Sequence, residues 1–130
     1  MSRGRLGRLA PLAVLTACAT GLRPLELPLA TDARTFEVCL EVLRSRFGRL
    51  AITDREAFLL QTEWSRVESP GRLLRRRATI FRAAPERLAV VVEESLLVGG
   101  LLGEPSWSVP KAQPSLERAL AASIEAALGA

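Results

Sequence analysis

The apolar residues of the chain change their spacing twice, and this change limits the folds that the chain can adopt. In segments 31–47 and 115–128 they recur every three or four residues, the period of an amphipathic helix. Between these segments the period is two, as in strands with one buried face. The order predicts an α+β fold: a two-layer sandwich in which an antiparallel meander of three to four strands carries the N-terminal and the C-terminal helix on one face.

Capping and turn residues place the boundaries of these elements. Thr31 or Asp32 can cap the first helix and Gly48 can end it, while Ser115 can begin the last helix. The segment between residues 101 and 114 is rich in Pro and Gly and is expected to be a loop that packs over the sheet. The four expected strands are 49–54, 57–67, 73–82 and 88–98.

The second and third of these strands should form a hairpin around Pro70-Gly71, in either of two registers. A two-residue turn places Arg66 opposite Arg75 and Trp64 opposite Arg77. One more loop residue places Trp64 opposite Ala78 and Thr62 opposite Ile80. We favour the second register because it collects the apolar side chains on one face, which would make Trp64 a central packing residue.

The N-terminal segment has the order of an export signal. Arg3, Arg5 and Arg8 precede the apolar stretch 9–17, which contains Pro11. This stretch is much shorter than the roughly 20 apolar residues of a membrane-spanning helix. The segment 1–17 is therefore expected to be a signal peptide that is removed.

Leu15, Thr16, Ala17 and Cys18 resemble the lipobox of bacterial lipoproteins, in which a branched apolar residue and two small residues precede the cysteine that receives the lipid. The resemblance implies that the Cys18 thiol is diacylated, that cleavage occurs before it, and that the new amino terminus receives a further acyl chain such as palmitate. Two or three chains hold a protein at a membrane without a spanning helix. Residues 18–30 would then be a lipidated flexible tether, and 31–130 a single small α+β domain.

The same resemblance implies a location. In lipoproteins of envelopes with two membranes, Asp after the acylated cysteine tends to retain the protein at the inner membrane, and this chain has Ala19 there. We therefore expect a lipid-anchored protein at the periplasmic face of the outer membrane. Cleavage removes three arginines and no acid, so the formal charge falls from +4 to +1. Such a nearly neutral body is not expected to bind nucleic acid.

The composition argues against catalysis, because the chain contains no His and no Tyr. Ser108 and Lys111 match the spacing of an S-x-x-K motif, but Pro110 opposes the helix that this motif requires. Glu93 and Glu94 are adjacent on a strand and should point to opposite faces. We expect no catalytic residues, no cofactor and no metal site. Cys39, on the apolar face of the first helix, is expected to be a buried free thiol.

The densest charge cluster offers possible contacts to an anionic ligand at Arg72, Arg75 and Arg77. Strand alternation sends Arg75 and Arg77 to one face and Arg76 to the other, and acids such as Glu63 or Glu93 could neutralise them across strands. The order of elements, with Thr62-Glu63-Trp64 ending a strand, is similar to that of small accessory lipoproteins of envelope assembly, such as those of lipopolysaccharide assembly and outer-membrane protein insertion. This resemblance implies a non-enzymatic adaptor or scaffold; the alternative is a binding module for an anionic lipid or glycan.

Overall fold

The structure is a computed structural model that describes residues 23–100 and 102–129. It confirms an α+β fold with an antiparallel sheet and two helices, and it contains more strands than the sequence predicted. In chain order the elements are β1 (Leu25–Leu27), α3 (Ala33–Phe47), β2 (Leu50–Asp54), β3 (Leu59–Thr62), β4 (Ser65–Ser69), β5 (Arg72–Ala84), β6 (Arg87–Val98), β7 (Ser106–Trp107), β8 (Lys111–Ala112) and α4 (Pro114–Gly129).

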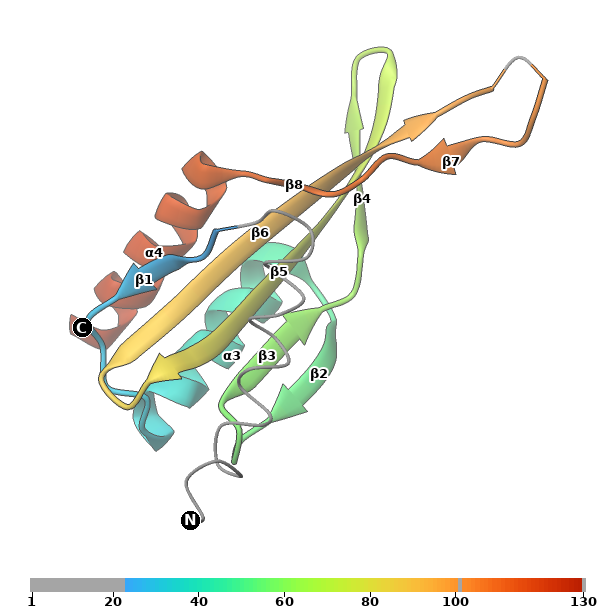
Figure 1. The fold of residues 1–130 in the computed structure, drawn as a ribbon. Coiled ribbons are helices and arrows are strands. Elements are labelled where there is room, and N and C mark those ends of the chain that lie inside the picture. The colour runs from blue at the N-terminus through green and yellow to red at the C-terminus, as the bar shows by residue number, and fades with distance from the viewer. Residues whose placement is uncertain (1–22, 101, 130) are drawn as a thin grey trace.

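The centre of the sheet is the long antiparallel hairpin formed by β5 and β6 (Figure 1). The strand order is β1-β6-β5-β3-β2. In addition, β4 pairs with residues 72–76 of β5, and both β7 and β8 pair with β6. Segment 57–67, expected to be one strand, is therefore divided into β3 and β4. The segment 101–114, expected to be a loop, contributes two short strands because its backbone continues the hydrogen bonding along the edge of β6.

Both helices pack on one face of this sheet, as predicted. Alternate residues of β5 and β6 form one apolar layer, since Ala78 pairs with Val92 and Ile80 with Val90. The buried apolar residues of both helices join the same core as this layer. The core includes Phe36, Cys39, Leu40 and Leu43 of α3, Leu120, Ala121 and Ile124 of α4, and Leu60, Ala78, Ile80, Leu88, Val90 and Val92 of the sheet.

The ends of α3 confirm the predicted caps. The Asp32 carboxylate accepts a hydrogen bond from the Thr35 backbone N–H at 2.9 Å, which satisfies one of the free donors of the first turn. Gly48 ends the helix with φ of +92°, and its N–H donates to the Arg44 carbonyl. This φ lies in the region that favours glycine.

The favoured register of the hairpin at Pro70-Gly71 is wrong. The turn has two residues, so Ser69 pairs with Arg72 and Arg66 with Arg75. Nearer the core the pairing shifts, because Gln61 lies opposite Thr79. Residues 62–64 thus lie opposite only two residues of β5, 77 and 78. This extra residue allows a two-residue turn at Pro70-Gly71 and, in β3, a different register that places Leu60 opposite Ile80 in the core. At the shift, the Thr62 hydroxyl accepts a hydrogen bond from the Ala78 N–H at 3.0 Å.

The residues expected to form the end of the tether belong to the sheet instead. Leu25 pairs with Val90 and Leu27 with Leu88, and Leu27 is 8% exposed. This strand pairs with residues 88–90 of β6, ahead of the residues of β6 that pair with β8 and β7. Pro24 and Pro28 flank these residues, and the segment has no strand-like alternation of apolar and polar residues. The strand is therefore evident only from its pairing with β6.

A buried carboxylate fills the gap between β1 and β8 on the edge of β6. Glu117, on the first turn of α4, is 3% exposed, and its Oε2 accepts a hydrogen bond from the Val92 N–H at 2.9 Å. The Val92 carbonyl in turn accepts from the Gln113 N–H. Glu117 therefore joins α4 to the sheet through hydrogen bonding as well as through packing. In the described part of the chain, no helix is long and apolar enough to cross a membrane.

Candidate functional site: an arginine and tryptophan face of the sheet

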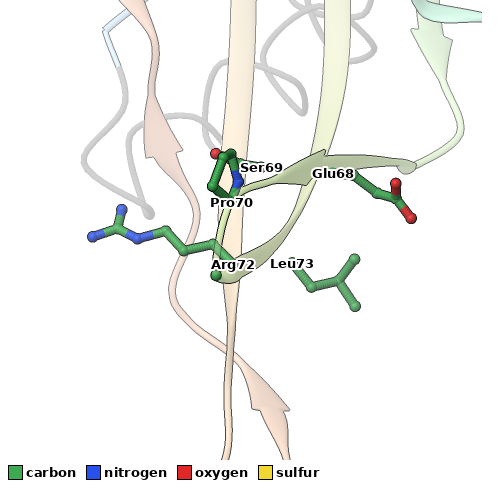
Figure 2. A pocket seen from close by; sticks show the side chains of 6 residues that line it. Glu68, Ser69, Pro70, Arg72 and Leu73 are labelled. Atoms are coloured by element: carbon green, nitrogen blue, oxygen red, sulfur yellow. The ribbon is translucent and has the colours of Figure 1, made fainter.

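The predicted arginines are divided by the alternation of β5. Arg75 and Arg77 lie on the sheet face opposite the helices, and Arg76 lies on the other face, as expected. Arg72 is separate from both, because it sits at the exposed end of the hairpin. Figure 2 shows that the Arg72 and Leu73 side chains point in opposite directions there. The structure therefore brings together two of the three proposed ligand contacts.

Two tryptophans complete this part of the surface, which we call the Arg-Trp face: Trp64, Arg75, Arg77, Glu93 and Trp107. The Arg75 guanidinium carbon lies 4.2 Å from the Trp64 ring centroid and 4.5 Å from that of Trp107, so it contacts both rings. The Arg77 guanidinium carbon lies 4.5 Å from the Trp64 ring centroid. These are distances typical of cation–π interactions.

The prediction that Trp64 is a central packing residue is wrong. It lies between β3 and β4, at the extra residue that shifts the register, and it is not part of the apolar core. Trp107 lies in the segment 101–114 that was expected to be a loop packing over the sheet, and its contact with Arg75 was not foreseen. The two tryptophans are 43 positions apart in the sequence, and no local pattern relates them.

The charges of this region are neutralised unequally. Glu93 is 4% exposed, and its carboxylate accepts two hydrogen bonds from the Arg77 guanidinium, at 3.0 and 3.2 Å. On the helix side of the sheet, Arg76 donates to Glu94 at 2.6 Å. Cross-strand acids thus neutralise Arg76 and Arg77, as the sequence suggested.

Arg75 differs from its neighbours. Among the described residues it forms no salt bridge, and its buried Nε has no hydrogen-bond partner. Burial lowers the pKa of Arg75, and the positive charge of Arg77 lowers it further. The guanidinium remains charged because the ordinary pKa of arginine is so high. The nearby Glu93 carboxylate, which pairs with Arg77, acts in the opposite direction and raises the pKa of Arg75. Arg75 is therefore a cation held between two aromatic rings that has no salt bridge of its own among the described residues.

Two surface hollows lined by described residues are less suited to binding a ligand than the Arg-Trp face. One is formed by six consecutive residues of the β4–β5 turn, Glu68 to Leu73, whose side chains splay apart (Figure 2). The other lies at the start of α3, where Arg55 pairs with Glu37 and Arg82 donates to Thr31. Its arginines already have partners within the chain.

The remaining predicted residues are placed as follows. Leu15, Thr16, Ala17 and Cys18 lie outside the described residues. Cys39 is fully buried, and burial raises the pKa of its thiol to about 12, so the unreactive neutral thiol dominates. Among residues 23–100 and 102–129, no group of three or more Cys, Asp and Glu side chains is arranged to hold a metal ion.

Comparison with known proteins found no matching family model and no matching curated protein. The Arg-Trp face offers flat aromatic surface, one unmatched cation and one buried ion pair, a combination suited to binding a protein or an anion.

Proposed function

We propose that the protein is a lipoprotein anchored at the periplasmic face of the outer membrane, where it acts as a non-enzymatic adaptor or scaffold of the cell envelope, in particular in outer-membrane assembly. The observation that carries this proposal is the lipobox Leu15-Thr16-Ala17-Cys18 behind an arginine-bearing start and a short apolar stretch. Ala19 supports the outer membrane as the destination.

The structure supports an adaptor through the Arg-Trp face. With both helices on the opposite side of the sheet, a partner at the Arg-Trp face would not displace the core that the helices share with the sheet. A second buried cluster, Phe81, Ala89 and Val91, lies farther along the same face. Trp and Arg are enriched at protein interfaces and dominate their binding energy. The proposed interface therefore has suitable residues on a rigid sheet.

Mass analysis of the N-terminal peptide from isolated membranes tests the anchor. We expect the mature chain to begin at Cys18 with two or three acyl chains. In a Cys18→Ser variant, the uncleaved chain should keep its signal segment and lack lipid. An unmodified N-terminus at Met1 in the wild-type protein would exclude the proposal.

Site-specific cross-linking tests the adaptor role. A photoreactive residue at Arg66, which is exposed and pairs with Arg75 across the strands, should capture one envelope protein in stoichiometric yield. The control is the same residue at Arg46, exposed on α3, which should capture none. Equal capture at both positions would show that the Arg-Trp face is not the interface.

A second function is favoured by the unmatched charge of Arg75: binding of an anionic lipid or glycan through Arg75 and Arg77. Arg75→Gln should lower the affinity for short-chain phosphatidic acid or a phosphorylated disaccharide at least tenfold in native mass spectrometry. Arg72→Gln is the matched control, because Arg72 lies away from the cluster, and should leave the affinity unchanged. If neither probe binds the wild-type protein, this alternative is rejected.

A further inference from the structure

The outer edge of β4 is a regular strand edge that has no partner in the described part of the chain. All five residues of β4 pair with β5, and the other edge of β4 pairs with no described strand. The other outer strands are less suited to pairing, because a shift in register interrupts β2 between Leu50 and Ile52, and β1, β7 and β8 have only two or three residues. An uninterrupted edge can accept a further strand through its free backbone groups.

The hairpin turn determines which backbone groups of β4 are free. Ser69 and Arg72 flank a two-residue turn, and the residues that flank such a turn are hydrogen-bonded to each other. Hydrogen-bonded and non-hydrogen-bonded pairs then alternate along the hairpin. The N–H and C=O groups of Arg66 and Glu68 therefore point away from β5, toward the free edge.

The side chains of the same two residues carry opposite charges. Arg66 and Glu68 are exposed, and neither forms a salt bridge among the described residues. Across the hairpin, Arg66 lies opposite Arg75, and Glu68 lies opposite Leu73. Like charges at directly opposed positions, such as the two arginines, destabilise a sheet. The edge of β4 thus presents a base and an acid that a further strand can neutralise.

The sequence of β4, Ser-Arg-Val-Glu-Ser, is complementary to itself in the antiparallel direction. When two copies of β4 lie side by side with Val67 opposite Val67, each Arg66 lies opposite Glu68 of the other copy. Each Ser65 then lies opposite Ser69. Symmetric registers centred on Arg66 or on Glu68 would instead bring like charges together. The register centred on Val67 is therefore the favourable one.

We infer that two copies of this chain associate through their β4 edges, as an antiparallel pair with two-fold symmetry centred on Val67. The free backbone groups of Arg66 and Glu68 supply the hydrogen bonds, and their side chains form two equivalent ion pairs across the symmetry axis. The two sheets become one continuous sheet, with both Arg-Trp faces on one side and the helices on the other. This inference goes beyond the proposed function and does not depend on it, because the pairing uses a strand edge. A cross-linker at Arg66 would then also join two identical chains, a product that mass analysis distinguishes from the capture of an envelope protein.

Disulfide cross-linking tests the register. The two copies of residue 67 would form a non-hydrogen-bonded pair with Cα atoms about 4.5 Å apart, which a disulfide can bridge. Val67→Cys should therefore give a disulfide-linked dimer under mild oxidation. Ser69→Cys is the matched control on the same strand and face, because its two copies would lie about 14 Å apart. The wild-type chain, oxidised identically, controls for the native thiols. Equal dimer yields for Val67→Cys and Ser69→Cys, or no dimer with Val67→Cys, would overturn the inference.

Analytical ultracentrifugation of the purified full chain over a concentration series tests the charges. Arg66→Glu should weaken the dimer at least tenfold, since it replaces both ion pairs by pairs of acids. Adding Glu68→Arg to the same chain restores opposite charges in the same register and should recover the wild-type affinity. Arg72→Glu, outside β4 on the same hairpin, is the control and should change the affinity less than twofold. A wild-type chain that stays monomeric throughout the series, or a dimer that Arg66→Glu leaves unchanged, contradicts the proposed pairing.

Discussion

At the scale of single residues, the polar groups buried in the sheet depend on their hydrogen-bond and ion-pair partners. Glu93 and Arg77 form a pair whose side chains are 6% and 23% exposed. Glu117 is a second buried carboxylate, and a backbone N–H is its hydrogen-bond donor. Burial without a partner is costly for any of these groups, so substitutions that remove one partner alone should have large effects.

Arg77→Met should lower the free energy of unfolding by about 2 to 3 kcal/mol at neutral pH, because it leaves the Glu93 carboxylate buried without its cation. Urea unfolding measures this change. Adding Glu93→Met should restore much of the loss. Arg44→Met is the control: its pair with Glu41 is exposed and should contribute less than about 1 kcal/mol. Equal losses for Arg77→Met and Arg44→Met would contradict the importance of the buried pair.

Glu117 should make the stability depend on pH in a defined direction. Burial raises its pKa above the ordinary value of 4.5. The native state therefore holds this proton more tightly than the unfolded chain. Its contribution favours folding most below pH 4.5 and is lost as the pH rises through the raised pKa.

Two substitutions test this reasoning. Glu117→Gln keeps an oxygen acceptor for the Val92 N–H but cannot ionise, so its stability relative to wild type should increase with pH across that interval. Glu117→Ala leaves the N–H without its acceptor and should cost about 1 to 3 kcal/mol. Urea titrations at a series of pH values measure both. If the difference between Glu117→Gln and wild type is independent of pH, Glu117 titrates normally.

At the scale of elements, local signals define the helices better than the strands. Asp32 and Gly48 bound α3 as predicted, because capping depends on groups within one turn. The strands depend on pairing between distant segments. The division into β3 and β4 and the register shift at residues 62–64 therefore became clear only in the sheet.

Gly48→Ala should destabilise the protein by about 1 to 3 kcal/mol, because its φ of +92° is strained for a residue with a side chain. A Cβ at this position would lie 3.8 Å from the Ser65 hydroxyl, so space is available and the backbone alone accounts for the cost. Gly99→Ala, in open space and without a positive φ, should stay within about 0.5 kcal/mol of wild type. Thermal and urea unfolding compare the two, and similar costs would contradict this account.

At the scale of the whole molecule, the folded body begins earlier than expected. Because β1 pairs with β6 and Leu27 packs in the core, residues 25–27 of the segment expected to be a tether belong to the folded body instead. Under the proposed lipidation of Cys18, the link between the membrane and the sheet would therefore be shorter than residues 18–30. The pairing of β1 also makes residues 25–27 part of the stability of the domain.

Leu27→Ala should therefore cost about 2 to 4 kcal/mol, as for other buried leucines. Glu26→Ala in the same strand removes only an exposed ion pair with Arg87 and should cost less than about 1 kcal/mol. Chemical denaturation of both variants tests whether β1 is structural. A negligible loss for Leu27→Ala would assign these residues to the tether after all.

Along the chain, the sequence by itself determined the α+β class, the two helices, the caps of α3, the position of the hairpin turn and the opposite orientation of Arg75 and Arg76, because these follow from local spacing. Tertiary structure alone decided the pairing of β1, the shifted register, the position of Trp64 and Trp107 around Arg75, and the hydrogen bond of Glu117. The physical reason is that neighbouring strands are chosen by the sum of many distant contacts. A shift of one residue changes which side chains meet while the local pattern stays the same.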